Sequence, residues 1–219
     1  MIICKRVSLI LCLIAASIIQ AQHIDWEAKV DADPKNAAVL TEAGIACYGL
    51  AASGQQKAGD LAEEYLGRLL ELQPRNTLAM VYYGSLMSLF ARDAEEPWEK
   101  MEYMQTAIAK MDKAVALSPE NAQVRLVRAS NALHLPAMFN RLGMALSDFA
   151  EIETQIQSGM SNLDSGALVT FYFNYGVGHK KKGRQDEAQA CFRRVVKMAP
   201  ESPLGQQAKT ALAAMVPQS

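Results

Sequence analysis

One helical template occurs four times along the chain, and it restricts the fold more than any other feature. The last copy places apolar residues at steps of four, three and three, and it closes with a proline: Ala188, Phe192, Val195, Met198 and Pro200. Such steps bring the side chains to one face of a helix. The same spacing occurs at Ala107, Met111, Ala114, Leu117 and Pro119, at Ala62, Leu66, Leu69, Leu72 and Pro74, and in its first part at Ala145, Phe149 and Ile152. The chain is therefore predicted to contain four amphipathic helices of one kind.

A second helical stretch with a small residue precedes each copy. Gly44, Gly84 and Ala129 each lie ten residues after a proline, and Gly176 holds the same place in the last unit. A small residue lets two helices approach closely, and the large residues of the template fill the adjoining space. The small residue precedes the template alanine by 12 residues in the last unit, but by 18, 23 and 16 residues in the others. We expect these additional residues to lengthen the loops within the pairs.

The stretch "YFNYGVGHKKKGRQDEAQACFRRVVKMAP", residues 172–200, resembles the tetratricopeptide repeat, whose pattern is an aromatic, a Leu-Gly step, Ala-x3-Phe and a closing Pro. His179 stands where an aromatic is usual. The resemblance extends over residues 34–200 and implies an all-α, TPR-like α-solenoid of about four antiparallel helix pairs. Because stacked repeats need covered ends, we expect a C-terminal capping helix after Pro203 and a short leading helix anchored by Trp26.

The first residues read as a secretory signal peptide. Lys5 and Arg6 precede an apolar run over residues 7–19, and the small Ala21 precedes a polar stretch. A run of 13 residues is short for a membrane span, which needs about 20. We therefore expect residues 1–21 to be removed, residues 22–219 to form the repeat domain, and the protein to be exported, periplasmic or secreted, without a stable transmembrane span. Retention of the segment as an anchor is the alternative.

Charge and cysteine content exclude several classes of function. Without Lys5 and Arg6 the chain has 20 basic and 23 acidic side chains, a net charge of −3, which does not indicate a nucleic-acid partner. The cysteines that remain are Cys47 and Cys191, both in apolar helical patterns, and they are predicted to be buried thiols that are not paired with each other.

The glycine- and lysine-rich stretch at residues 176–184 is predicted to be a turn between helices. Gly178-His-Lys-Lys-Lys-Gly183 has the glycine spacing of a phosphate loop, but Arg-Gln follows where Lys-Ser/Thr is required. Gly183 is expected to end a helix, with Lys180, Lys181 and Lys182 in its last turn. The three histidines have no metal-site spacing, and no catalytic constellation is visible. The sequence therefore predicts a protein that is not an enzyme and has neither a cofactor nor a metal.

Two kinds of function fit this pattern. The first is a scaffold or adaptor that binds a peptide or protein partner on the concave face built by the first helices, where we place Tyr48, Tyr82, Ser85, Ser130, His134, Asn174 and Lys181. The second is capture of a small ligand, or support of a transporter, in a pocket lined by Met80, Tyr83, Met87 and Phe139. An aromatic group around the longest insertion, which includes Trp98 and Tyr103, offers a further recognition surface.

Arg125 and Arg128 depart from the repeat pattern, because they fall where an aromatic and a leucine are usually buried. They are included among the candidate partner-binding residues, since they can hold an anionic group of a ligand or partner. The alternative is a structural ion pair with Asp112 and Asp148.

Overall fold

The computed structural model describes residues 26–215, and every regular element in that range is helical. Residues 26–32 form a short helix, and the following elements are α2 (Ala37–Ala52), α3 (Gln56–Leu72), α4 (Thr77–Asp93), α5 (Pro97–Leu117), α6 (Ala122–Ala132), the 3-10 turn η1 (Ala137–Phe139), α7 (Leu142–Gln157), α8 (Ser165–Lys181), α9 (Gln185–Met198) and α10 (Pro203–Ala213). The predicted all-α, TPR-like class is confirmed. No helix in the described range is long and apolar enough to cross a bilayer.

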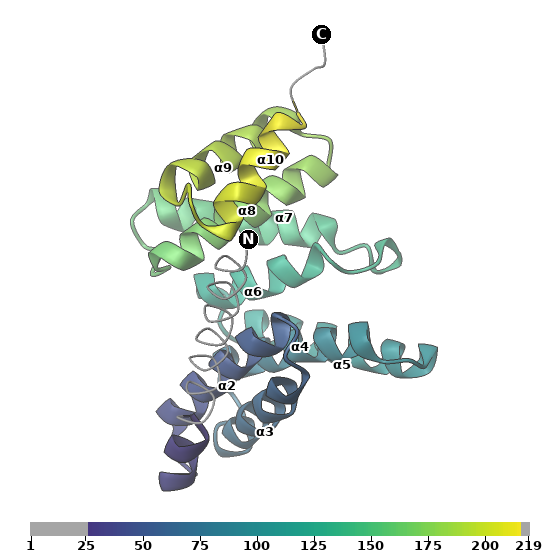
Figure 1. The fold of residues 1–219 in the computed structure, drawn as a ribbon, viewed down its shortest axis with the longest axis vertical. Coiled ribbons are helices and arrows are strands. Elements are labelled where there is room, and N and C mark those ends of the chain that lie inside the picture. The colour runs from purple at the N-terminus through teal and green to yellow at the C-terminus, as the bar shows by residue number, and fades with distance from the viewer. Residues whose placement is uncertain (1–25, 216–219) are drawn as a thin grey trace, which may run out of the picture. The chain divides into compact units, whose positions relative to one another are not determined.

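The helices follow one another as antiparallel pairs joined by short connections, as Figure 1 shows for α2 with α3 and for α8 with α9. The chain divides into an N-terminal unit that ends at Ala107 and a C-terminal unit that begins at Ile108. In the N-terminal unit α3 and α2 both pack on α4, and in the C-terminal unit α8 contacts α6, α7, α9 and α10. Each unit therefore buries its apolar stripes by stacking a pair on its neighbour.

The closing prolines are followed by helix caps. Pro34, Pro74 and Pro119 each precede an asparagine by two residues, and Asn36, Asn76 and Asn121 are the N-caps of α2, α4 and α6. The Asn121 side chain accepts hydrogen bonds from the backbone N–H groups of the second and third residues of α6, at 3.0 and 3.1 Å. Such caps satisfy N–H groups that have no partner inside the helix. Each proline therefore ends one pair at a point from which the next helix can begin.

Close approach at the small residues is confirmed. A Cβ on Gly44 would lie 2.7 Å from Leu66, and one on Gly176 would lie 2.8 Å from the Phe192 ring. The four template alanines are fully buried, and so are the large residues that follow them by one turn: Leu66, Met111, Phe149 and Phe192. The two helices of a pair thus meet where a small residue faces a large one.

The prediction that the insertions lengthen loops is wrong for the first two pairs. The connections between α2 and α3 and between α4 and α5 are three residues each, the same as between α8 and α9. The additional residues instead extend the helices: Ala188 is the fourth residue of α9, whereas Ala107 is the eleventh of α5. The seven further residues at the start of α5 add about two turns. Only the third pair has a longer connection, residues 133–141, which contains η1.

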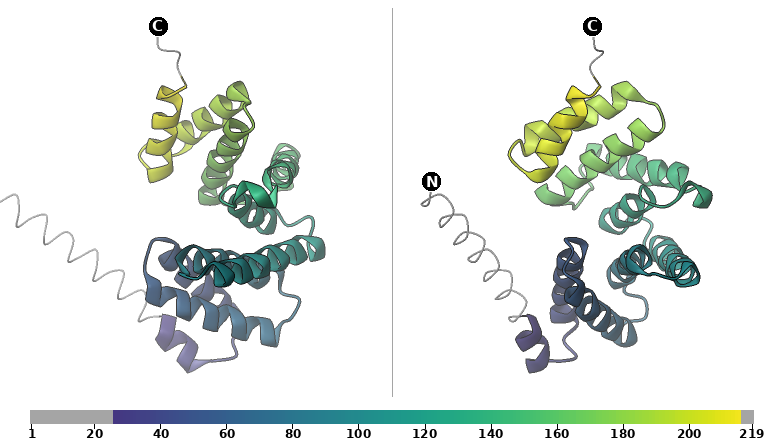
Figure 2. Two further views of the ribbon diagram at one scale, coloured as in Figure 1. Left: turned by 90° about the vertical axis from the view of Figure 1, so that its right-hand side faces the viewer. Right: turned by 45° about the vertical axis from the view of Figure 1, so that its right-hand side comes forward.

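The capping helix is also confirmed. As Figures 1 and 2 show, α10 lies against α9, and it contacts α8 as well. Ala208 on α10 is fully buried, and the Ser202 hydroxyl caps the helix by accepting from the Gly205 N–H at 3.0 Å. At the other end, Trp26 lies in the short helix with the Lys29 ammonium 4.6 Å from its ring centre. The predicted signal peptide, residues 1–21, lies outside the described residues.

Cys47 and Cys191, the cysteines within the described residues, are free and buried, as predicted. Burial, together with weaker effects of nearby charges, raises the pKa of Cys47 to about 11 and that of Cys191 to about 12. The thiols are therefore protonated at neutral pH and poor nucleophiles. Gly183 has the positive φ, +80°, of the predicted turn, and Lys180 and Lys181 lie in the last turn of α8, while Lys182 is its C-cap.

Candidate functional site

The nine candidate partner-binding residues fall into three groups. Tyr48, Tyr82 and Ser85 lie on α2 and α4, in the N-terminal unit. Ser130, Asn174 and Lys181 lie on α6 and α8, with His134 two residues beyond the end of α6. Arg125 and Arg128 lie on α6 and point to a different set of partners.

In the first group Tyr48 is the centre. The Ser85 hydroxyl donates to the Tyr48 hydroxyl at 2.7 Å, and the Tyr82 ring packs edge-on against Tyr48 with 5.4 Å between ring centres. Ser85 is only 1% exposed, so it positions Tyr48 and cannot itself reach a partner. Burial raises the pKa of Tyr48 although the Ser85 bond opposes this, so the phenol stays protonated at neutral pH. The result is a rigid aromatic face with a polar edge.

A groove opens one helical turn beyond this aromatic face. Its volume is about 810 Å³, and it lies between the C-terminal ends of α2 and α4 and the start of α3. Ala51 lines it three residues after Tyr48, and Leu89 lines it four residues after Ser85. The full lining is Ala51, Ala52, Ser53, Gly54, Gln56, Lys57, Gly59, Asp60, Leu89, Phe90, Arg92 and Asp93. We call it the α2–α4 groove.

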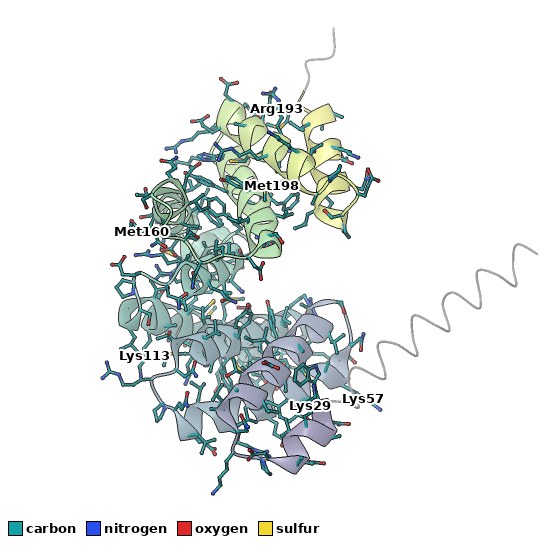
Figure 3. All side chains as sticks on the ribbon, turned by 90° about the vertical axis from the view of Figure 1, so that its left-hand side faces the viewer. Lys29, Lys57, Lys113, Met160, Arg193 and Met198 are labelled. Atoms are coloured by element: carbon teal, nitrogen blue, oxygen red, sulfur yellow. The ribbon has the colours of Figure 1, made fainter. Side chains whose placement is uncertain are left out.

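The α2–α4 groove combines apolar walls with charges of both signs. Phe90 reaches the start of α3, since a Cβ on Gly59 would lie 3.1 Å from its ring. Arg92 pairs with Asp93, with its Nε 2.6 Å from Oδ1, and both side chains remain about half exposed. Lys57, labelled in Figure 3, and Asp60 are exposed, and neither forms an ion pair within residues 26–215. Such a surface suits a peptide with an apolar side chain between polar groups.

The second group joins α6 to α8. The Asn174 amide donates to the Ser130 hydroxyl at 2.8 Å, and the Lys181 ammonium donates to the backbone carbonyl of Leu133 at the end of α6. Partial burial, followed by the positive charge of Lys181, lowers the pKa of His134. The imidazole is therefore neutral at pH 7, and the ammonium is the positive charge of this group.

The two arginines of the third group bind carboxylates of their own unit. Arg128 holds Asp148 through two hydrogen bonds and reaches Asp112 at 3.1 Å, and Arg125 Nη1 lies 2.6 Å from Asp148. Arg141 also donates to Asp112. Burial works against the charge of Arg128, but the bonds and charges of the two aspartates prevail and raise its pKa. This geometry favours the structural alternative for both arginines, because Asp148 is 2% exposed and needs their charge.

Of the four residues named for a ligand pocket, Met80, Tyr83 and Met87 belong to the N-terminal unit. Met80 and Met87 are core residues, at 2% and 3% exposure, and the Tyr83 hydroxyl donates to Glu63 at 3.3 Å. Phe139 belongs to η1, in the other unit. None of them lines the α2–α4 groove.

Sequence reasoning identified the aromatic face but not the groove beside it. The lining residues Lys57, Asp60 and Phe90 match no motif, and they are brought together by the additional turns at the end of α4 and the start of α3. The length of the insertions is the signal in the sequence for these additional turns.

Comparison with known proteins finds a family model that matches one segment of the chain and solved structures that share its fold. The family model of the tetratricopeptide repeat matches residues 169–202. A solved structure of TTC0263, a thermophilic TPR protein in Thermus thermophilus, is similar with a TM-score of 0.68 at 16% identity over 94% of each chain. The MamA protein gives a TM-score of 0.48 at 17% identity over 84% of each chain. YrrB, a TPR protein with an unusual peptide-binding site, gives 0.38 at 16% identity over 84% of this chain and 97% of its own. Curated protein sequences give no match.

Proposed function

We propose that this tetratricopeptide-repeat protein is a scaffold that binds an extended segment of a protein partner across α2 and α4. TPR scaffolds generally mediate interactions with proteins or peptides, and they are typically not catalytic. The α2–α4 groove carries the proposal, because it continues the aromatic face of Tyr48 and Tyr82 within one unit. An apolar side chain of the partner enters between Ala52 and Phe90, and Tyr48 contacts the adjacent backbone.

The group on α6 and α8 supplies a second contact in the same proposal. Lys181 and His134 present one positive charge and one neutral imidazole, while Ser130 and Asn174 are bonded to each other. We expect this group to contact an acidic or polar part of the partner. Arg125 and Arg128 are left out of the binding surface, since Asp148 and Asp112 hold them.

Filling the groove tests the proposal. Ala52 lines the groove and is exposed, so Ala52→Trp places a large ring there without entering the core. Peptides selected from a random library on the parent protein are then titrated against the variant. We expect their affinity to fall by about tenfold or more, because the pocket for the anchoring side chain is occupied.

The matched control is Ala190→Trp, at an exposed alanine of α9 outside the groove. It should leave binding unchanged. Selected peptides that bind Ala52→Trp as well as the parent would place the binding surface elsewhere.

We also propose that the protein is exported and that its mature chain begins at Gln22. The order of basic, apolar and small residues in the first 21 positions supports this. Intact mass spectrometry of protein purified from its native source is the test. A mass that retains residues 1–21 would contradict cleavage.

A further inference from the structure

The two additional turns at the start of α5 carry an exposed apolar stripe. Trp98 is 63% exposed and Met101, three residues later, is 37% exposed, so both lie on the same side of the helix. The opposite side faces inward, where the Tyr103 ring packs on Phe90 of α4 with 5.7 Å between centres. The additional turns of α5 are thus held in place by the face that carries Tyr103, and Trp98 lies on the opposite, exposed face.

The rim of this stripe is acidic. Glu95, Glu96, Glu99 and Glu102 surround it, and within the described part of the chain none of their carboxylates takes part in a side-chain hydrogen bond or an ion pair. Lys100 is the basic residue among them. Carboxylates before and within the first turn favour the helix dipole, which accounts for the first three glutamates. It does not account for Glu102 in the second turn, nor for the exposed Trp98.

We propose that this surface, which we call the α5 stripe (Trp98, Met101 and the four glutamates), docks a basic amphipathic segment of a partner protein. A tryptophan beside a methionine offers a large and adaptable apolar contact. A lysine or arginine of the partner can lie over the indole ring, where it gains a cation–π interaction. The unpaired carboxylates attract and orient the same basic residues. The α5 stripe is separate from the α2–α4 groove and goes beyond the function proposed for it.

The negative charge of the α5 stripe favours a basic segment of a partner protein over an anionic membrane surface. An anionic membrane surface would be repelled by four glutamates, although the exposed tryptophan alone would favour an interface. The other exposed methionines of the described residues do not form such a stripe: Met138 lies in η1, Met160, labelled in Figure 3, lies in the loop after α7, and Met198 lies at the end of α9. Single exposed apolar residues of this kind need no explanation.

Trp98 itself reports binding. The chain has two tryptophans, Trp26 and Trp98, so Trp26→Phe leaves the α5 stripe as the source of tryptophan emission. The probe is a panel of synthetic 18-residue helical peptides, each with lysine and arginine on one face and leucine on the other, together with scrambled peptides of equal charge. We expect a blue shift and reduced acrylamide quenching with the amphipathic peptides, and binding that weakens steeply as salt rises. Absence of binding by every peptide at low salt would overturn the proposal.

Variants separate the apolar and electrostatic parts. Affinities are measured by calorimetry for each variant in the native background. Trp98→Ala should lower affinity by about tenfold or more, and its exposed position makes folding insensitive to the change. The triple change of Glu96, Glu99 and Glu102 to Gln should lower affinity and reduce its salt dependence. The matched control changes three exposed glutamates outside the α5 stripe, Glu42, Glu71 and Glu120, to Gln, and it should retain most of the affinity.

Three further results would also overturn the proposal. One is equal loss of affinity in the two triple variants, which would indicate attraction by net charge alone. Another is unchanged binding by Trp98→Ala. The last is concentration-dependent self-association in sedimentation equilibrium that Trp98→Ala abolishes, which would assign the α5 stripe to a second copy of this chain.

Discussion

Arg128 on α6 holds Asp148 on α7 in a two-point ion pair, with Nε 2.8 Å from Oδ2 and Nη2 2.8 Å from Oδ1. The two helices form one pair of the C-terminal unit, and the carboxylate lies at their interface with 2% of its side chain exposed. An arginine fork matches a carboxylate at two points, so this contact fixes orientation as well as charge. The ion pair therefore joins α6 to α7 at a position where the usual repeat buries an apolar side chain.

Removing Arg128 should destabilise the protein strongly. Arg128→Met is expected to lower the free energy of unfolding by on the order of 3–5 kcal/mol, because a buried carboxylate loses its main partner. We expect a loss at the lower end of this range, because Arg125 still forms an ion pair with Asp148. Urea unfolding measures the loss. Replacing Asp148 with Leu in the same chain should recover more than half of it. Arg193→Met, at an exposed arginine, is the control and should change stability by less than about 0.5 kcal/mol.

A Cβ added at Gly176 is predicted to destabilise the folded protein. In Gly176→Ala the new atom would lie 2.8 Å from the Phe192 ring and 3.2 Å from the Cβ of Cys191. Both neighbours are buried, so overpacking should cost about 1–3 kcal/mol in thermal or urea unfolding. Gly49→Ala is the matched control, since it lies inside α2 with nothing within 4 Å of the new Cβ. It should stabilise by about 0.4–1 kcal/mol. Equal effects of the two changes would show that close packing is not why position 176 is glycine.

The packing inside each pair could be predicted because it depends on local spacing. Small and large residues at fixed intervals, such as Gly176 and Phe192, define the contact without knowledge of the rest of the chain. The ion pairs of Arg128 could also be anticipated, because the repeat assigns Asp112 and Asp148 to neighbouring helices. The caps at Asn36, Asn76 and Asn121 also have a signal in the sequence, because asparagine is a favoured N-cap residue and each follows a closing proline by two positions.

The insertions could not be placed from the pattern alone. Additional residues can lengthen a loop or extend both helices, and the choice depends on whether the new turns find a partner. The additional turns of α4 and α5 find such a partner in each other, because Phe90 packs on Tyr103. Both the α2–α4 groove and the α5 stripe result from such extensions. The candidate surfaces therefore depend on tertiary contacts that a repeat template omits.

The capping role of α10 can be tested by truncation. Deleting residues 203–219 removes α10 with the fully buried Ala208 and uncovers the apolar face of α9 and α8. We expect lower unfolding temperature and aggregation, because an end repeat needs a covering helix. Light scattering during heating measures both. A truncated protein as stable and monomeric as the parent would contradict the capping role.

His179 should make stability depend on pH. Its side chain is buried, its ring packs against the Tyr175 ring at a tilt of 35° with 4.2 Å between centres, and its Nδ1 has no hydrogen-bond partner within residues 26–215. Burial lowers its pKa; Arg184 acts in the same direction, while Glu187 and Glu153 oppose it. The unfolded chain therefore binds a proton at a higher pH than the folded chain does. The contribution to stability is complete above the unfolded pKa of about 6.5, and it is lost as the pH falls through that value toward the lower folded pKa.

His179→Phe restores the aromatic that the repeat usually has, and it should remove this pH dependence. At pH 8 the variant is expected to be as stable as the parent or more so, because an unpartnered buried nitrogen is replaced by carbon. The difference in unfolding free energy between variant and parent should then grow in favour of the variant between pH 7.5 and pH 5.5, a window chosen to span about 6.5. The pKa of His134 is lowered as well, so the comparison is repeated in a His134→Gln background to remove that second contribution. Denaturant unfolding at several pH values measures the difference in unfolding free energy between variant and parent. A difference that stays constant across the window would mean that His179 is not the titrating group.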